Sequence, residues 1–525
     1  MKKHTLTLLL VSTFCYSFLA VGQPTPTIGS SAANTLPHLH TRGGILYDEY
    51  GRQVVLHGVN EVNKQPPLIA APDTNGFNEA HVKFIADHGF SVVRFGVFWA
   101  AIEPHKQAYD FRYLLKVKQM VELLAKYRIY VLIDFHQDAF ASKHGGLGAP
   151  DWAALSDIPW TPEMNVGFPL NDFGGAVVNG QTVSPVLDQD NDAFWSNQDN
   201  IQDAYIEMVA TVVRYLRGTP GILGYDLMNE PSPGSSWTEA GYIDHTGAFD
   251  FSKGCPTFDA NMLTSFYTKL IQAVQKADRE AIAWYEPLGL LGLGSPTFIG
   301  QLGRENIGFD FHNYMSWDIN FAFQQAAKQQ TLNQAALLMS EFGAGTLDAT
   351  QMKDMLGIAD QLNLSWIEWA YSNNPIYKFS AWPGGLPTDP TKQGIVYDLK
   401  AFVSEQCSTN KRCTAVNWPL LSALERPYPR YIAGTVEGGG YSYDPVSRIV
   451  LLSFSKNSAH AAASESAITE IYLPIATYPQ GYTLELEGVT RLPESTPTRL
   501  LLKNNASGDR VSVRITPKNA LFLPG

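Results

Sequence analysis

Strand-length apolar runs alternate with amphipathic helical patterns over most of the chain. The first apolar run covers residues 54–60, and a helical pattern over residues 78–88 separates it from a second run at residues 91–98. A helical pattern over residues 113–127 then leads to a third run at residues 129–135. This alternation is typical of strand–helix–strand units with parallel strands.

The alternation continues to about residue 406. A fourth run begins at Ile222, and four more cover residues 281–286, 307–312, 336–343 and 365–370. Eight such repeats predict an α/β fold, a closed (β/α)8 TIM barrel. Residues 139–192, after the third run, show no sustained period and contain Trp152, Trp160 and Phe168. A long loop on the carboxyl side of a strand predicts a wall beside a substrate site.

Short β-rich runs separated by turns replace the helical patterns after Cys413. Prolines at positions 419, 427 and 429 suggest a stiff connector. The runs that follow cover residues 449–454, 467–474, 482–486, 499–502 and 511–515. This pattern predicts a smaller antiparallel β-sandwich domain at residues 417–525, behind a catalytic barrel at residues 43–416.

The amino terminus predicts a secretory signal peptide at residues 1–22. Lys2 and Lys3 precede an apolar run from Leu6 to Val21, and small residues end it at Gly22. The run is interrupted by polar residues and is shorter than the roughly 20 apolar residues of a membrane span. Cleavage leaves residues 23–42 as an extended lead. We therefore expect an extracellular protein, or one of a lysosomal or digestive compartment.

Charge and cysteine spacing narrow the possible partners. The formal net charge of -12 argues against a general affinity for nucleic acid, which needs basic patches. Cys407 and Cys413 are close enough in sequence to form a disulfide in an oxidising compartment, which leaves Cys255 without a partner. No cysteine spacing resembles a zinc site, and we expect neither a metal nor an organic cofactor.

Two of the predicted strands end in carboxylic acids. The fourth ends at Asn229-Glu230-Pro231, and the seventh delivers Glu341. Chemistry in such barrels lies at the carboxyl ends of the strands. Each acid alone can be structural, as a helix cap or a buried ion-pair partner, but two together are the minimum for cleaving a glycosidic bond. At a separation of about 5 Å, Glu341 attacks the anomeric carbon while Glu230 protonates the leaving oxygen and later activates water.

Further polar residues at strand ends can support this pair. Arg94 on the second strand can keep Glu341 ionised, although a structural ion pair is the alternative. Tyr314 and His312, at the end of the sixth strand, are placed to hydrogen-bond Glu341 and Glu230, respectively. Asn229 can orient the acid or bind a sugar hydroxyl, and Trp369, after the eighth strand, can form a stacking floor for the sugar.

The ordered set of strand-end residues resembles that of glycoside hydrolase family 5. The set is Arg94, His136, Asn229, Glu230, His312, Tyr314, Glu341 and Trp369. More narrowly, the chain resembles the endoglycoceramidases in Asn63-Lys64, in residues 134–138 and 145–152, and in the connector Arg426-Pro-Tyr-Pro429. The resemblance implies hydrolysis of the bond between oligosaccharide and ceramide in glycosphingolipids, with Glu230 as acid/base and Glu341 as nucleophile. It also implies that Lys64 and Asp138 contact sugar hydroxyls.

A glycolipid substrate requires a place for its lipid. Apolar residues at 288–294 and 376–383 can form a groove for ceramide and allow transient contact with a membrane or micelle surface, although ordinary loop packing is the alternative. Two enzyme alternatives stay open: a relative that prefers glucosyl- or galactosylceramide, and a family 5 β-glucanase. A non-catalytic carbohydrate- or lipid-binding barrel is disfavoured by the two carboxylates. The sequence indicates neither the glycan head group nor the oligomeric state.

Overall fold

The computed structural model describes most of the chain in nine segments. They are residues 36–159, 185–236, 251–315, 318–343, 349–372, 394–408, 411–436, 438–456 and 467–518. The predicted signal peptide, Trp160, Phe168 and the apolar loop at 376–383 lie outside these segments, as does the predicted lead up to residue 35.

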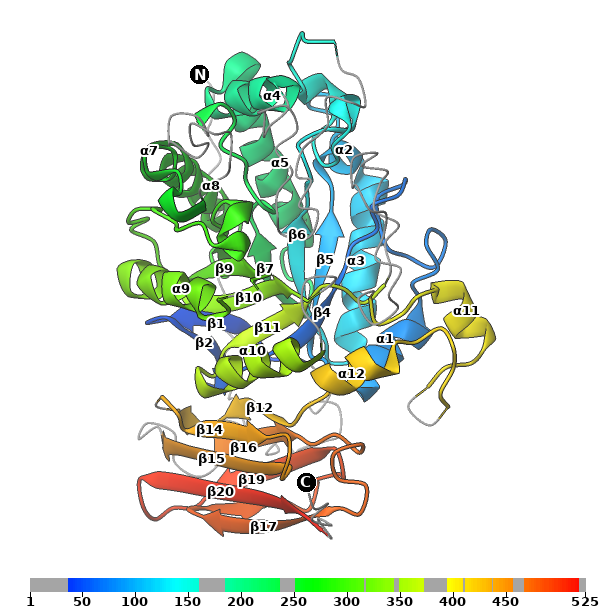
Figure 1. Ribbon diagram of the computed structural model, residues 1–525, viewed down its shortest axis with the longest axis vertical. Helices are drawn as coiled ribbons and strands as arrows, with labels where there is room; N and C mark the ends of the chain where they lie inside the picture. The colour runs from blue at the N-terminus through cyan, green and yellow to red at the C-terminus, as the bar shows by residue number, and fades with distance from the viewer. Residues whose placement is uncertain are drawn as a thin grey trace, which may run out of the picture.

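Eight parallel strands close into a barrel, as the alternation predicted (Figure 1). Their order around the barrel is β10 (Ala336–Phe342), β11 (Ser365–Glu368), β4 (His57–Glu61), β5 (Val92–Val97), β6 (Tyr130–Phe135), β7 (Ile222–Asp226), β8 (Ala283–Tyr285) and β9 (Ile307–Asn313). The largest departures from the predicted ranges are in the first and fourth strands. The first run divides into β3 (Gln53–Val54) and β4, and the fourth strand ends at Asp226, so that Glu230 lies on the loop beyond it.

Helices on the outside of the barrel bury one apolar face each. The barrel helices are α1 (Glu79–Asp87), α2 (Trp99–Ile102), α3 (Phe111–Lys126), α4 (Pro185–Trp195), α5 (Ile201–Leu216), α7 (Pro256–Phe258), α8 (Thr264–Ala277), α9 (Asn320–Asn333), α10 (Ala349–Gln361), α11 (Leu399–Ser404) and α12 (Trp418–Leu424). In α3, the Asp110 carboxylate caps the amino terminus by accepting from two backbone N–H groups. Val117, Val121 and Leu124 of this helix are fully buried, as their helical spacing predicted.

Two antiparallel sheets form the predicted smaller domain. One sheet has the order β1 (Leu39–Arg42), β2 (Ile45–Asp48), β3, β12 (Tyr428–Ile432), β16 (Ile468–Tyr472), β19 (Arg499–Asn504) and β18 (Val489–Arg491). The other has the order β13 (Gly434–Thr435), β15 (Ile449–Lys456), β20 (Arg510–Pro517) and β17 (Tyr482–Glu487), with β14 (Tyr441–Asp444) paired to β15. Residues 39–54, which the sequence analysis divided between lead and barrel, thus share a sheet with the carboxyl-terminal domain. The link is the pairing of Val54 with Tyr431.

The sandwich lies at the amino ends of the barrel strands, at the bottom of the view in Figure 1, whereas α4 lies at the opposite end. The Tyr428 hydroxyl in β12 donates to the Gly89 carbonyl at 2.9 Å and lies 2.8 Å from the Ser91 hydroxyl oxygen, just before β5. The proline-containing connector is therefore partly a sheet strand that packs under the barrel. The carboxyl ends of the barrel strands remain available for a site.

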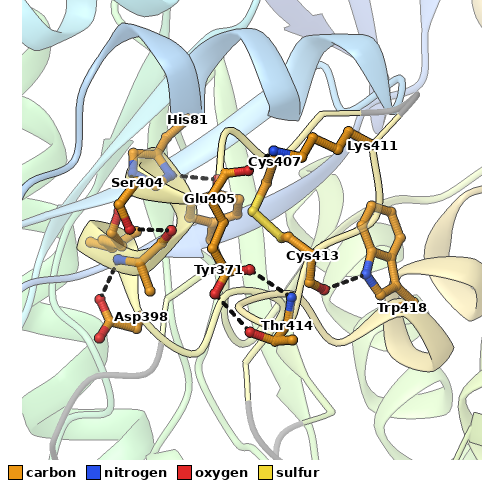
Figure 2. The surroundings of a disulfide bond; sticks show 12 residues. His81, Tyr371, Asp398, Ser404, Glu405, Cys407, Lys411, Cys413, Thr414 and Trp418 are labelled. Atoms are coloured by element: carbon orange, nitrogen blue, oxygen red, sulfur yellow. Dashed lines mark hydrogen bonds between the residues drawn. A yellow bond between two sulfur atoms is a disulfide. The ribbon is translucent and has the colours of Figure 1, made fainter.

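Cys407 and Cys413 form the predicted disulfide, in the segment between α11 and α12 (Figure 2). Trp418 Nε1 donates to the Cys413 carbonyl at 2.9 Å, and the Thr414 hydroxyl and N–H both donate to the Glu405 carboxylate. Cys255 has a free, buried thiol. Within the described segments, no helix combines the length and the apolar character that a membrane span requires.

Candidate active site

Glu230 projects from the loop after β7 in an unusual backbone conformation. Its φ angle is 44°, in the left-handed region that costs a residue other than glycine on the order of 1 kcal/mol. Hydrogen bonds hold both sides of this residue: its N–H donates to Glu286 Oε2 at 2.8 Å, and its carbonyl accepts from Gln137 Nε2 at 2.8 Å. The local backbone therefore fixes where the Glu230 carboxyl points.

Glu341 lies in β10 and is held at both carboxylate oxygens. Arg94 Nη1 donates to Oε1 at 2.6 Å, and the Tyr314 hydroxyl donates to Oε2 at 2.7 Å. Both contacts were expected from the sequence. They fix the orientation of its carboxylate plane.

The two glutamates meet at His312. One carboxylate oxygen of Glu230, one of Glu341 and a ring nitrogen of His312 all lie within 4.8 Å of one another. His312 Nδ1 is 2.7 Å from Glu230 Oε1, the predicted contact, and 3.6 Å from Glu341 Oε2. Retaining glycosidases hold their carboxyls at about 5 Å, whereas inverting enzymes leave roughly 6.5–9.5 Å for a water molecule. The geometry of this pair fits direct attack by a carboxylate on the sugar.

The exposure of the two carboxyls differs in the direction that their predicted roles require. The Glu230 side chain is 35% exposed, and that of Glu341 is 6% exposed. An acid that protonates a leaving group must reach it from the open side of the site, whereas a nucleophile gains from being fixed beneath the sugar.

Asn229 is buried and orients its neighbours. Its Oδ1 accepts from Arg94 Nη2 at 2.8 Å, and its Nδ2 donates to the Gln137 carbonyl at 2.9 Å. The amide thus links the guanidinium under Glu341 to the chain segment that holds Glu230. These contacts fit the orienting role that the sequence suggested for Asn229.

A second group of predicted residues packs around Trp369. Lys64 Nζ lies 4.6 Å from the centre of the Trp369 ring and 2.7 Å from Asp138 Oδ2. His136 stacks on the same indole at 5.6 Å and donates from Nδ1 to Asp134 Oδ2 at 2.8 Å. Although burial alone raises the pKa of Asp138, Lys64 and His136 bring it well below its usual range. Every residue predicted for the site therefore lies in one of two adjoining groups at the carboxyl end of the barrel.

The residues that sequence reasoning missed lie beneath Glu341. Arg94 is fully buried and binds three further carboxyl groups: Asp226 at 2.6 Å, Glu286 at 3.0 Å and Asp134 at 3.1 Å. Asp226 and Asp134 lie inside apolar strands, where charged residues are rare unless paired. That rarity is the signal by which they can be found in a sequence.

The carboxyl groups around Arg94 and the nearby Asp310 of β9 form one buried cluster. Three members of this cluster hold their protons unusually tightly. Burial raises the pKa of Asp226, Glu286 and Asp310 to about 8 each, and the nearby carboxyls add to the shift. Glu286, Asp310 and His312 also bring three potential metal ligands within 4.8 Å of one another.

His312 carries a proton more readily than a free imidazole. Burial lowers its pKa, but Glu341, Glu286 and Glu230 together raise it well above the usual value. A charged His312 donates from Nδ1 to Glu230 and presents Nε2 to Glu286 Oε1 at 3.3 Å.

Two of the apolar residues after β8 do not face the expected lipid groove. Leu288 and Leu291 are 3% and 1% exposed and belong to the barrel core. Glycines at 289 and 292 instead let this segment, η8 (Gly289–Leu293), pass close to Glu230 and His312. The groove prediction is wrong for these two leucines because their side chains pack into the barrel core.

The insertion after β6 contributes to the surroundings of the site where it is described. Phe140 and Ala149 line a small pocket together with His136 and Gln137. Trp152 is half-buried and donates from Nε1 to the Glu103 carbonyl at 3.1 Å. The described part of this insertion thus includes residues beside the predicted site.

Known proteins resemble both parts of the chain. Residues 47–375 match the cellulase (glycosyl hydrolase family 5) family, and residues 426–515 match the glycoside hydrolase family 5 C-terminal domain. Endoglycoceramidase I of Rhodococcus hoagii is 27% identical over 488 residues, which are 88% of this chain and 85% of the relative. An endoglycoceramidase of Cyanea nozakii is 25% identical over 434 residues, covering 78% and 79%. The solved ganglioside GM3 complex of endo-glycoceramidase II from Rhodococcus sp. aligns with a TM-score of 0.66 at 22% identity, covering 90% of this chain and 99% of that one.

Proposed function

The chain belongs to glycoside hydrolase family 5, and on this basis we propose that it is an endoglycoceramidase. It hydrolyses the β-linkage between the oligosaccharide and the ceramide of glycosphingolipids and releases both parts intact. The observation that carries the proposal is the Glu230–Glu341 pair, within 4.8 Å through one oxygen each. The names of these two relatives support the glycolipid substrate.

In the first step, Glu341 is the nucleophile. Its carboxylate, fixed by Arg94 and Tyr314, forms a bond to the anomeric carbon as the bond to the ceramide oxygen breaks. Glu230 gives its proton to that oxygen, and ceramide leaves as a neutral alcohol. The products of this step are a glycosyl ester on Glu341 and an ionised Glu230.

In the second step, Glu230 acts as a base. It takes a proton from a water molecule whose oxygen attacks the anomeric carbon, and the bond to Glu341 breaks. Two inversions leave the glycan with its original β configuration. Glu230 is again protonated and Glu341 again ionised, so each turnover consumes one water molecule.

Trp369, with Lys64, His136 and Asp138, forms the sugar-binding side of the site in this proposal. The indole offers an apolar surface to the sugar ring, and the ammonium and carboxylate offer hydrogen bonds to its hydroxyls. Lys64 and Asp138 already form an ion pair with each other. A sugar hydroxyl would therefore hydrogen-bond to two groups that are held in place before the substrate binds.

We also propose that the protein is secreted and meets its substrate transiently at a membrane or micelle surface. The predicted signal peptide supports secretion, and the Cys407–Cys413 disulfide is typical of proteins that fold in an oxidising compartment. Contact with a lipid surface follows from the location of ceramide, which does not dissolve freely in water.

The test is incubation of the protein with a ganglioside and, in parallel, with glucosylceramide and carboxymethylcellulose. We expect mass spectrometry to find free oligosaccharide and ceramide from the ganglioside, and NMR to find the β anomer of the first product. Glu341→Gln should lower turnover at least about thousandfold, because it removes the nucleophile. The exposed Glu485→Gln, on the sandwich, is the matched control and should keep full activity.

Each other product contradicts the proposal in a distinct way. Cleavage of glucosylceramide alone indicates a relative that removes a single sugar, and cleavage of cellulose alone indicates a β-glucanase. Binding without turnover on any of the three substrates indicates a carbohydrate- or lipid-binding protein.

A further inference from the structure

Glu286 is a buried carboxyl residue directly behind Glu230. It follows β8 and is 1% exposed. Its Oε2 accepts from the Glu230 N–H at 2.8 Å, and its Oε1 lies 3.0 Å from Arg94 Nη2 and 3.3 Å from His312 Nε2. One carboxyl group therefore contacts the backbone of one glutamate, the guanidinium that binds the other, and the imidazole between them.

Glu286 acts on Glu230 at two levels. Its bond to the Glu230 N–H helps to hold the left-handed backbone, whose φ angle is 44°. Through His312 it also affects the side chain, because the imidazole contacts Glu286 at Nε2 and Glu230 Oε1 at Nδ1. A change at Glu286 thus alters both the position of the acid and its hydrogen-bond donor.

The segment after Glu286 also packs closely against Glu230. A Cβ atom at Gly289 would lie 2.8 Å from Glu230 Cβ, closer than real Cβ contacts allow. Only glycine lets the chain that carries Glu286 pass directly along Glu230. The contact places Glu286 and the acid on adjoining stretches of backbone with no room for a side chain between them.

We propose that Glu286 is the positioning residue of the acid/base: it holds the Glu230 backbone directly and the Glu230 carboxyl through His312. It does not touch the substrate. The inference rests on the double-displacement mechanism of the proposed function, but not on the identity of the lipid.

The consequence is a dependence on the leaving group. A sugar bonded to a strongly acidic phenol departs without protonation, whereas one bonded to an ordinary phenol needs the acid. Misplacing Glu230 therefore slows the second kind of substrate and spares the first. Misplacing Glu341 or loosening the whole site slows both kinds equally.

The experiment measures kcat/KM of Glu286→Gln on 2,4-dinitrophenyl and phenyl β-lactosides, because kcat/KM reports the glycosylation step. We expect a loss on the order of tenfold or more for the phenyl lactoside and less than about twofold for the dinitrophenyl lactoside. Glutamine keeps one acceptor oxygen, so Glu286→Ala should widen the difference between the two substrates.

Asp310→Asn is the matched control. Asp310 is an equally buried carboxyl of the same cluster, and among the described contacts it has no hydrogen bond or ion pair with Glu230. We expect this variant to change kcat/KM by similar factors for the two lactosides. A leaving-group effect as large as that of Glu286→Gln would show that any carboxyl of the cluster suffices and would overturn the specific role of Glu286.

Folding of each variant is checked at the nucleophile itself. A 2-deoxy-2-fluoro lactoside with a dinitrophenol leaving group should label Glu341 completely, as a mass shift on a single peptide. Equal losses of Glu286→Gln on both lactosides, or no loss on either, overturn the proposal. If the wild type forms no adduct on Glu341, the double-displacement mechanism is wrong and so is this inference. If the wild type labels Glu341 but does not cleave the ganglioside, only the proposed substrate is wrong, and the role of Glu286 still holds.

Discussion

The two ends of the barrel each hold an ion network around one buried charge, and the two networks have opposite composition. At the carboxyl end, one guanidinium, that of Arg94, lies within 3.1 Å of four carboxyl groups. At the amino end, one carboxylate, that of Glu470 in β16, lies 3.2 Å from Arg128 of the barrel and 2.6 Å from Arg499 of β19. Arg430 of β12 adds a third cation beside it.

This difference sets the protonation of each network. At the amino end, burial opposes ionisation, but Arg128, Arg430 and Arg499 bring the pKa of Glu470 to about 2. At the carboxyl end, burial and the excess of acids over the cations Arg94 and His312 raise the pKa of Asp226 and Glu286 to about 8. The interface network is thus arranged for stability, whereas the network at the site keeps protons and charges close to the reacting groups.

The position of the amino-end network also bears on the role of the sandwich. Tyr130 at the start of β6 shares a hydrogen bond with Tyr431 at 3.2 Å between the two hydroxyls, and Arg426 forms an ion pair with Asp360 of α10. These contacts close the end of the barrel that lies opposite Glu230 and Glu341. They favour a structural role for the sandwich over the binding of lipid or carbohydrate at the site.

The largest effect is expected from Arg94→Met, which removes the cation of the carboxyl-end network. Four buried carboxyls lose their shared partner, so the free energy of unfolding should fall by about 3–5 kcal/mol. Glu341 loses a 2.6 Å contact, and kcat/KM should fall at least about hundredfold. Urea unfolding and aryl lactoside kinetics measure the two losses.

Arg52→Met is the matched control for Arg94. Arg52 forms a similarly buried ion pair with Asp48 at 2.7 Å, but at the sandwich side of the molecule. Its loss should lower the free energy of unfolding and leave kcat/KM unchanged. Full activity in Arg94→Met would refute the assignment of Arg94 as the partner of the nucleophile.

A smaller effect, on stability alone, is expected from Glu470→Leu. The change leaves Arg128, Arg430 and Arg499 without their shared carboxylate, so the free energy of unfolding should fall by about 3 kcal/mol. The folded enzyme should keep its kcat/KM, because the site lies at the other end of the barrel. Loss of activity before any loss of structure would mean that the sandwich communicates with the site.

Glu485→Leu serves as the control on the same domain. Glu485 is 79% exposed and lies 3.9 Å from Arg514, and such surface pairs contribute little. The urea midpoint of this variant should match that of the wild type. A loss equal to that of Glu470→Leu would remove the distinction between the buried interface pair and a surface pair.

The sequence predicted the carboxyl end of the molecule better than the amino end. Each of these polar residues lies on or just after an apolar run of strand length. The sequence alone could therefore place Glu230, Glu341, Arg94, His312 and Tyr314 together. Their mutual contacts follow from the closed barrel, which brings the carboxyl ends of all eight strands to one face. At this end of the barrel, the sequence pattern of each strand is therefore enough to predict which residues meet.

Non-local pairing is the information that the local pattern lacks. Val54 pairs with Tyr431, and nothing near either residue in the sequence indicates the other. The burial of Leu288 and Leu291 was missed for the same reason, since an apolar loop has the same composition whether it packs inward or faces solvent. The role of Glu286 likewise depends on a backbone N–H of Glu230, which no side-chain motif can reveal.

The smallest effect, taken over a single pH unit, is a difference in pH dependence between the two networks. Asp310 has its pKa raised to about 8, so it stabilises the fold fully below its unfolded pKa near 4 and progressively less as pH rises to 8. Between those values the unfolded state has lost the proton that the folded state keeps, and the free energy of unfolding falls by up to about 1.4 kcal/mol per pH unit for one such group. Asp310→Asn should make this decline shallower.

Glu470 has the opposite pH dependence. Its pKa is lowered to about 2, so it stabilises the fold above pH 4.5 and loses this contribution as pH falls toward 2. Glu470→Leu should therefore reduce the pH dependence of the free energy of unfolding only on the acid side. Urea unfolding between pH 3 and pH 9 separates the two, and an unchanged slope in Asp310→Asn above pH 5 would mean that Asp310 is ionised in the folded protein and that the two networks titrate alike.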